Sequence, residues 1–171
     1  MLLDPELGDR AKPYSWRVAL LPIFGKQGYD LYTQYRRDEL WDGPNNIKLL
    51  ARMPQVYAMP GSRRAMEGFT HYQVLVGPGT TFERPDLRLN TFRAESFPRG
   101  AAQTILVVEA ADPVPWTKPE DRPYAPDGPL AKVGGLVGNG FHAMFADATV
   151  RWMEGAQQES ALRTLVPRNG L

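Results

Sequence analysis

Few side chains in this sequence could act as general bases near neutral pH, because its two histidines are His71 and His142. His142 lies five positions before Asp147 in the stretch NGFHAMFADATVRWM, residues 139–153. Residues five apart on one strand point to opposite faces, so a hydrogen-bonded pair of these two would need a bulge or a bend. We therefore predict that His142 belongs to a sheet face and that Asp147 forms a turn.

A second group of candidates surrounds Trp116. Four carboxylates lie within thirteen residues of sequence: Glu109, Asp112, Glu120 and Asp121. Calcium needs several oxygen ligands gathered from loops, so Asp112, Glu120 and Asp121 are the candidate ligands if the protein holds a metal. The spacing is not that of a fixed calcium-binding loop, and in the alternative interpretation these carboxylates are solvated while Trp116 anchors the loop. Glu109 ends an apolar strand, so once buried it needs a partner such as Arg151 or a backbone donor.

Several other chemistries lack the residues that they require. The stretch VGPGTTF, residues 76–82, has neither the lysine nor the following helix of a phosphate-binding loop, so we interpret it as a turn. The serines show no nucleophile-elbow context, and two histidines offer few bases for a serine triad. The absence of cysteine excludes disulfides, thiolate metal sites and iron–sulfur clusters. An enzyme is the least favoured class, and it would need a cleft that joins His142 to an acidic side chain.

The composition indicates one domain without a strongly charged partner. The 171 residues can bury a core without disulfides, and 20 Lys and Arg against 19 Asp and Glu give a net charge of +1. No whole-molecule field therefore favours nucleic acid or an anionic membrane. The start, MLLDPELGDRAKPY, shows no signal-peptide pattern, and no apolar run approaches the roughly 20 residues of a membrane span. We predict an extension over 1–14, a single domain over 15–171, and no cofactor unless calcium binds the acidic loop.

The spacing of apolar residues predicts short helices first and strands afterwards. Helical patterns cover 16–24, where Ser15 can cap, then 28–40 and 42–53. Strand patterns follow at 55–59, 71–77, 104–110, 141–147 and 149–153, and a last helical pattern covers 157–167. The final two strands form a hairpin around Asp147 and Ala148. Helices followed by strands predict an α+β fold with an antiparallel sheet of about five strands.

Seven stretches together resemble a known family. They are SWRVALLP, LWDGPNN, LLARMPQVY, YQVLVGPGTTFE, TILVVEAADPVPWTKPED, GNGFHAMFADATVRWM and LRTLVPRNG, and they cover nearly the whole chain from Ser15 onward. On these motifs, and on VPWTKPED above all, the chain is similar to the prepilin-like planctomycete proteins called domain of unknown function 1559, also labelled bacterial solute-binding protein family 10. The resemblance implies a pseudopilin-like α+β head and a place in the cell envelope or outside the cell.

The resemblance covers the head only, because the hydrophobic first helix of such proteins is missing from this sequence. Three polar features of relatives also differ. The polar turn before the TI strand is reduced to Gln103, the Asp-Gly hairpin turn becomes Asp147-Ala148, and a histidine ten positions before that aspartate is replaced by Val137. If these polar groups form a ligand site in relatives, part of that site is lost here.

Two functions follow as expectations. The first is a non-enzymatic structural or interaction module, a subunit of an oligomer or larger assembly. A pilin-type sheet without its first helix should expose an apolar face that another chain, or a second copy, must cover. The second is a solute- or glycan-binding module in which Trp116 and Tyr124 provide a stacking surface, while Glu109, Asp112 and Asp121 provide polar or metal contacts.

Overall fold

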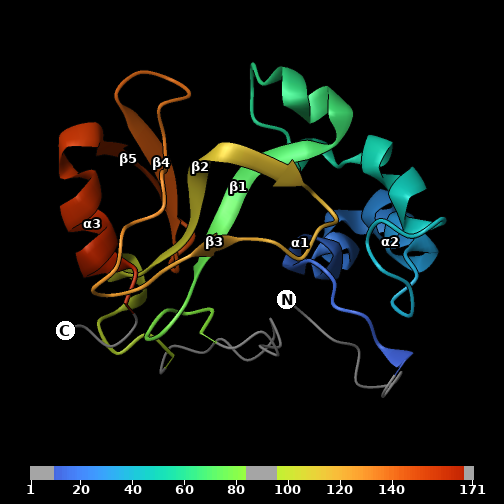
Figure 1. The fold of residues 1–171 in the computed structure, drawn as a ribbon, viewed down its shortest axis with the longest axis horizontal. Helices are drawn as coiled ribbons and strands as arrows, with labels where there is room; N and C mark the ends of the chain where they lie inside the picture. Colours follow the sequence, from blue (N-terminus) through green and yellow to red (C-terminus); the bar gives the residue numbers. More distant parts are fainter. Residues whose placement is uncertain (1–9, 84–95, 168–171) are drawn as a thin grey trace. The chain divides into compact units, whose positions relative to one another are not determined.

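The computed structural model describes residues 10–83 and 96–167, and Figure 1 draws their helices and strands. The contacts between these residues group into two compact units. The first unit contains residues 10–70 and 113–120. The second contains residues 71–83, 96–112 and 121–167.

The first unit is built from short helical segments. They are α1 (Trp16–Ala19), η2 (Leu21–Phe24), α2 (Gly25–Gln34), η3 (Asn46–Arg52), η4 (Gln55–Tyr57) and η5 (Arg63–Glu67), where η denotes a 3-10 helix. Ser15 caps α1 as predicted, since its Oγ accepts the backbone N–H of Arg17 at 3.2 Å. The three helical patterns predicted at the start of the domain are therefore present, although they are split into shorter segments.

Two predictions for the first unit are wrong in detail. Helix α2 ends at Gln34 instead of continuing to residue 40, because Tyr35 takes an extended backbone conformation. The predicted strand over 55–59 is instead the 3-10 turn η4, in which the Tyr57 N–H donates to the Pro54 carbonyl at 2.9 Å. A short apolar run does not distinguish a strand from a buried helical turn, and here the preceding proline begins a turn.

Trp116 lies in the core of the first unit. Its side chain is completely buried, and its ring stacks on Tyr57 with centroids 6.2 Å apart. The indole N–H donates to the carbonyl of Leu50 at 3.1 Å. Trp16 packs its edge against the same Tyr57 ring. The loop after the long apolar strand is therefore anchored by aromatic packing.

The strands form one mixed sheet, most of which belongs to the second unit. They are β1 (Phe69–Val76), β2 (Ile105–Pro115), β3 (Arg122–Pro123), β4 (Gly140–Phe145) and β5 (Val150–Glu154), in the spatial order β3-β1-β2-β4-β5. The β2–β4 and β4–β5 pairs are antiparallel, as predicted, and β3 pairs in parallel with β1. The α+β class is confirmed. The sheet has five strands, but β3 stands in place of the strand predicted over 55–59, and its parallel pairing makes the sheet mixed and not antiparallel throughout. The two-residue β3 carries no periodicity of its own, so the sequence pattern missed it.

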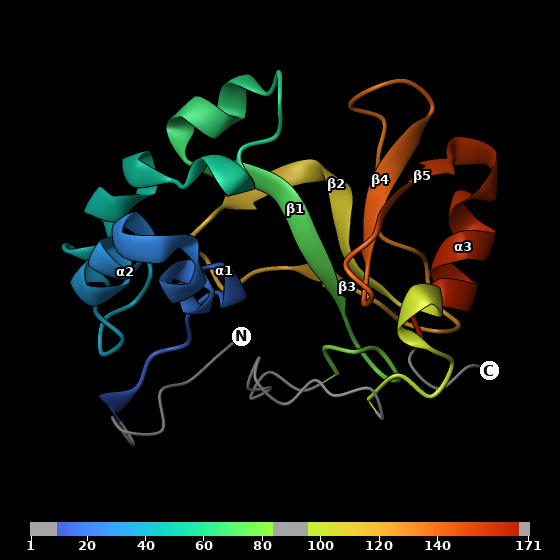
Figure 2. The same ribbon diagram turned by 180° about the vertical axis from the view of Figure 1, so that it is seen from behind.

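Helix α3 (Gln158–Leu165) packs on one face of the β4–β5 hairpin. Figures 1 and 2 show it beside these strands from opposite directions. The core here contains the buried side chains of Phe141, Ala143, Phe145, Leu162 and Val166. Alternation along β4 sends its remaining side chains to the opposite face.

Candidate functional site

The face of the β4–β5 hairpin that points away from α3 carries His142, Met144, Val150 and Trp152, and we call these four residues the hairpin face. Its register follows from the pairing of His142 with Trp152 and of Met144 with Val150. Side chains paired in this way lie on the same side of the sheet. The inward residues of β4 are buried, so the two faces differ sharply in exposure.

The hairpin face exposes large apolar side chains. Val150 is 63% exposed and Trp152 is 40% exposed. Leu136 and Val137, in the loop before β4, are exposed as well. In the described part of the second unit, the exposed large apolar residues are Leu136, Val137, Val150 and Trp152. Two of them, Val150 and Trp152, lie on the same face of the hairpin.

Trp152 is held in place on this open face. A Cβ atom built on Gly140 would lie 2.5 Å from Cζ2 of Trp152, so the indole rests directly on the glycine backbone. The His142 ring meets the indole edge to face, with centroids 4.9 Å apart. The indole N–H donates to Oε1 of Glu154 at 3.2 Å. The orientation of the indole is therefore fixed by its own neighbours.

Glu109, on the neighbouring strand β2, holds His142 in place. Its Oε2 accepts the backbone N–H of His142 at 2.8 Å, and both carboxylate oxygens lie 3.1 Å from the His142 Nδ1. An ionised carboxylate only accepts hydrogen bonds, so Nδ1 carries the hydrogen while Glu109 is charged. Burial raises the pKa of the nearby Tyr72 hydroxyl, and the negative charge of Glu109 raises that pKa further.

The sequence anticipated a backbone donor for Glu109 but missed His142 as the residue that supplies it. Val108 pairs with Ala143, so the next residues along the two strands, Glu109 and His142, come together. Glu109 is the single ionisable residue in the pattern TILVVEA, and His142 is the single ionisable residue in β4. That coincidence was the available signal, but its use required the long-range register of β2 and β4.

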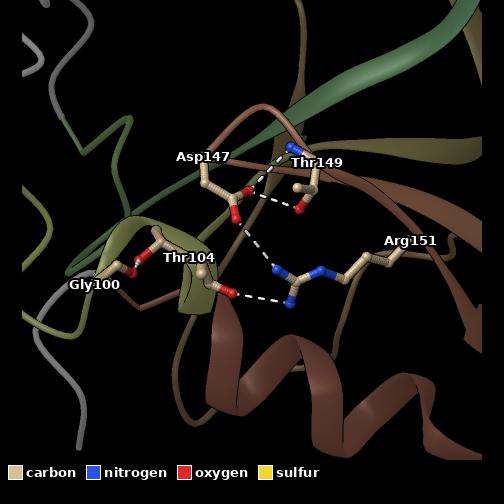
Figure 3. Close-up of polar contacts among 6 residues, drawn as sticks. Gly100, Thr104, Asp147, Thr149 and Arg151 are labelled. Atoms are coloured by element: carbon tan, nitrogen blue, oxygen red, sulfur yellow. Dashed lines mark hydrogen bonds and ion pairs between the residues drawn. The ribbon is translucent and has the colours of Figure 1, made fainter.

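Asp147 forms the hairpin turn, as predicted, and Figure 3 shows its contacts. Its carboxylate accepts the backbone N–H and the hydroxyl of Thr149 at 3.0 and 2.7 Å. These hydrogen bonds, with a smaller contribution from the charge of Arg151, lower the pKa of Asp147. The guanidinium Nη2 of Arg151 lies 3.3 Å from Oδ2 of Asp147, and Nη1 donates to the Ala102 carbonyl at 2.9 Å. The predicted alternative pairing of Arg151 with Glu109 is thus replaced by this turn contact.

The aromatic residues predicted for the acidic loop do not form a stacking surface. Trp116 is completely buried in the first unit, and Tyr124 is only 4% exposed in the second. Each instead fills a core, so neither ring face is open to a ligand.

The predicted metal ligands have separate partners. Asp112 pairs with Arg122 at 3.1 Å, Asp121 accepts the Val74 N–H at 3.0 Å, and Glu120 pairs with Lys118. Among residues 10–83 and 96–167, no three His, Asp or Glu side chains come together in a way that could hold a metal ion. The proposed set of Asp112, Glu120 and Asp121 is therefore wrong for the described structure, because each carboxylate is used locally.

A groove of about 520 Å³ lies in the first unit, between α2 and the segment after η3. Its apolar lining includes Phe24, Leu31 and Val56. The charged residues on its rim are bonded to neighbours on the protein, since Asp30 pairs with Lys26 and Arg52 donates to Gln34. The groove offers a ligand polar and apolar surface in similar measure.

Comparison of the chain with models of protein families, with curated proteins and with solved structures finds no match. The similarity to prepilin-like proteins stays a prediction from the sequence motifs. Within the described residues, none of the helices has the length and apolar character needed to cross a membrane.

Proposed function

We propose that this protein is a non-enzymatic interaction subunit that binds a protein partner through the hairpin face. The observation that carries the proposal is the exposure of Val150 and an oriented Trp152 on one side of a short hairpin. Tryptophan is enriched among the residues that dominate binding energy at protein interfaces. The motif resemblance supports the same class of function, because pilin-type heads act within assemblies.

We also propose that the Glu109–His142 pair orients the surface and does not catalyse a reaction. The pair meets the distance required of an acid–base couple, at 3.1 Å. However, Glu109 also accepts the backbone N–H of His142, and its side chain is only 9% exposed. A carboxylate used in this way replaces a ladder hydrogen bond between strands. Its first role is therefore to keep β4 and the His142 ring in position.

A variant pair tests the interaction proposal. The double variant Val150→Ser with Trp152→Ser removes the two exposed large apolar side chains of the hairpin face. The control variant, Met66→Ser in the first unit, removes an apolar side chain that is 87% exposed. The wild-type chain, purified from its native source, is examined by light scattering and native mass spectrometry. We expect association with itself or with a fixed protein, loss of that association in the double variant, and none of this loss in Met66→Ser. A monomeric wild type, or equal behaviour of the two variants, would contradict the proposal.

Solute binding is the second candidate, and the groove of the first unit favours it over the loop around Trp116. The volume of about 520 Å³ falls in the range of small-molecule sites. Val56→Asp would place a charge on the groove lining. If the native protein carries a small molecule, this substitution should release it without affecting the association through the hairpin face.

A further inference from the structure

Two carboxylates lie beside the hairpin face, whose stretch of sequence is flanked by Lys132 and Arg163. Glu154 follows Trp152 on the same strand and accepts its indole N–H, and Glu109 lies behind His142. Between Val133 and Leu162 the sequence contains a single Lys or Arg, Arg151. Within this stretch of sequence, Arg151 is therefore the one permanently charged cation near the carboxylates beside Trp152.

That cation points to the other side of the hairpin. The Arg151 guanidinium lies 4.0 Å from the centroid of Phe145, which is a core residue facing α3. It is also paired with Asp147, as Figure 3 shows, and it donates to the Ala102 carbonyl. Arg151 therefore neutralises the turn and leaves the carboxylate of Glu154 beside Trp152 without an Arg or Lys of the hairpin.

The indole presents a face that suits a cation. Gly140 lies against one part of the indole, the His142 ring meets it edge to face, and its N–H donates to Glu154, yet 40% of the residue stays exposed. The face of an aromatic ring attracts cations through its quadrupole, and Trp is the strongest such ring in proteins. An adjacent carboxylate adds a charge-assisted hydrogen bond to the same ligand.

We propose that the partner of the hairpin face contributes an arginine side chain, whose guanidinium stacks on Trp152 and donates to the carboxylate of Glu154. The proposal rests on the proposed docking function and specifies the chemistry of the partner. Arginine fits better than lysine because its planar guanidinium can stack and donate hydrogen bonds at once. Val150 and Met144 then contact the apolar side chains that flank this arginine.

Charge complementarity also excludes an acidic partner segment. A carboxylate or phosphate placed over Trp152 would meet the carboxylate of Glu154, which accepts the indole N–H. Like charges brought together at an interface oppose binding. The surface thus discriminates between partners by charge as well as by apolar contact.

The test uses two synthetic peptides that differ only in charge. One alternates valine with arginine, and the other carries citrulline, which has nearly the same shape but no charge, in place of each arginine. Binding is followed through the indole N–H resonance of Trp152 in the full chain, assigned by its loss in Trp152→Leu. The resonance of the buried Trp116 provides an internal control, because it should not shift.

We expect the arginine peptide to shift the Trp152 resonance and to bind about five- to twentyfold more tightly than the citrulline peptide. Glu154→Gln should reduce the affinity for the arginine peptide about two- to fivefold, with little effect on the citrulline peptide. Trp152→Leu keeps an apolar side chain but removes the aromatic face, so it should remove most of the preference between the two peptides. Because this variant lacks the reporting resonance, its binding of each peptide is measured by isothermal titration calorimetry, alongside the wild type.

Two results would overturn the inference. Equal binding of the two peptides, each with a shift of Trp152, would mean that the face docks apolar segments without reading charge, and the proposed docking function would survive. No shift of Trp152 with either peptide would refute the arginine contact itself. The docking function would then depend on the association experiment, which uses no peptide. Circular dichroism of each variant verifies that it is folded.

Discussion

Replacing Trp116 by Ala should destabilise the protein far more than replacing Trp152 by Ala. Trp116 is completely buried, stacks on Tyr57 and donates its indole N–H to Leu50. Removing a buried aromatic side chain of this size costs about 3 to 5 kcal/mol of unfolding free energy, because apolar contacts are lost and a cavity is left. Trp152 packs one side on Gly140 and is 40% exposed, so its loss should cost about 1 kcal/mol.

A third variant separates packing from hydrogen bonding. Trp116→Phe retains most of the ring packing against Tyr57 but leaves the Leu50 carbonyl without its indole donor, which should cost about 1 to 3 kcal/mol. Urea unfolding followed by far-ultraviolet circular dichroism measures all three variants without depending on tryptophan fluorescence. If Trp116→Ala unfolds within about 1 kcal/mol of the wild type, Trp116 is not a core residue and the account of the loop fails.

Three further predictions concern pH and the turn. Burial raises the pKa of both Tyr35 and Tyr57 above the ordinary value of 10.0. The unfolding free energy should therefore be fully retained below pH 10.0 and should fall as the pH rises above that value. In urea titrations at alkaline pH, Tyr57→Phe should show a shallower fall. The pKa of Asp147 is lowered from its ordinary value of 3.8, so the pH dependence runs the opposite way. Its contribution to stability is present above pH 3.8 and is lost as the pH falls through the lower pKa of the folded state. The stability difference between wild type and Asp147→Asn should therefore shrink in acid. Ala148 has a φ of 65°, so Ala148→Gly should raise the thermal midpoint, with a gain of up to about 1 kcal/mol, and a lower midpoint would show that this backbone is unstrained.

The hairpin was predictable because its signal is local. FHAMFAD and TVRWM alternate with a period of two around Asp147, and strand alternation alone assigns Phe141 and Phe145 to one face and His142 to the other. The conformation of Ala148 follows from its place in the turn, where relatives in the predicted family carry glycine. The long apolar strand at Ile105–Pro115 was found for the same reason, since its composition suits a central strand.

The remainder depends on contacts that a sequence does not display. Trp116 and Tyr124 lie in a proline-rich loop, and only the packing of distant elements decides whether such rings face solvent or a core. The Glu109–His142 pair requires the register of β2 and β4, and its two residues lie 33 positions apart in the sequence. The sequence pattern assigns Trp152 to a strand, but it does not show that the indole packs on Gly140 and donates to Glu154, because these contacts depend on the pairing of β4 with β5 and on the side-chain conformation.

Site-specific photo-crosslinking would test the docking role of the hairpin face most directly. A photoreactive amino acid replaces Val150 on the hairpin face in one variant and Glu159 on α3, whose side chain is 74% exposed, in the other. Both variants are produced in the native host and irradiated there. We predict a discrete crosslinked protein species from position 150 and none from position 159. The same products from both positions, or none from position 150, would contradict the proposal that this face binds the partner.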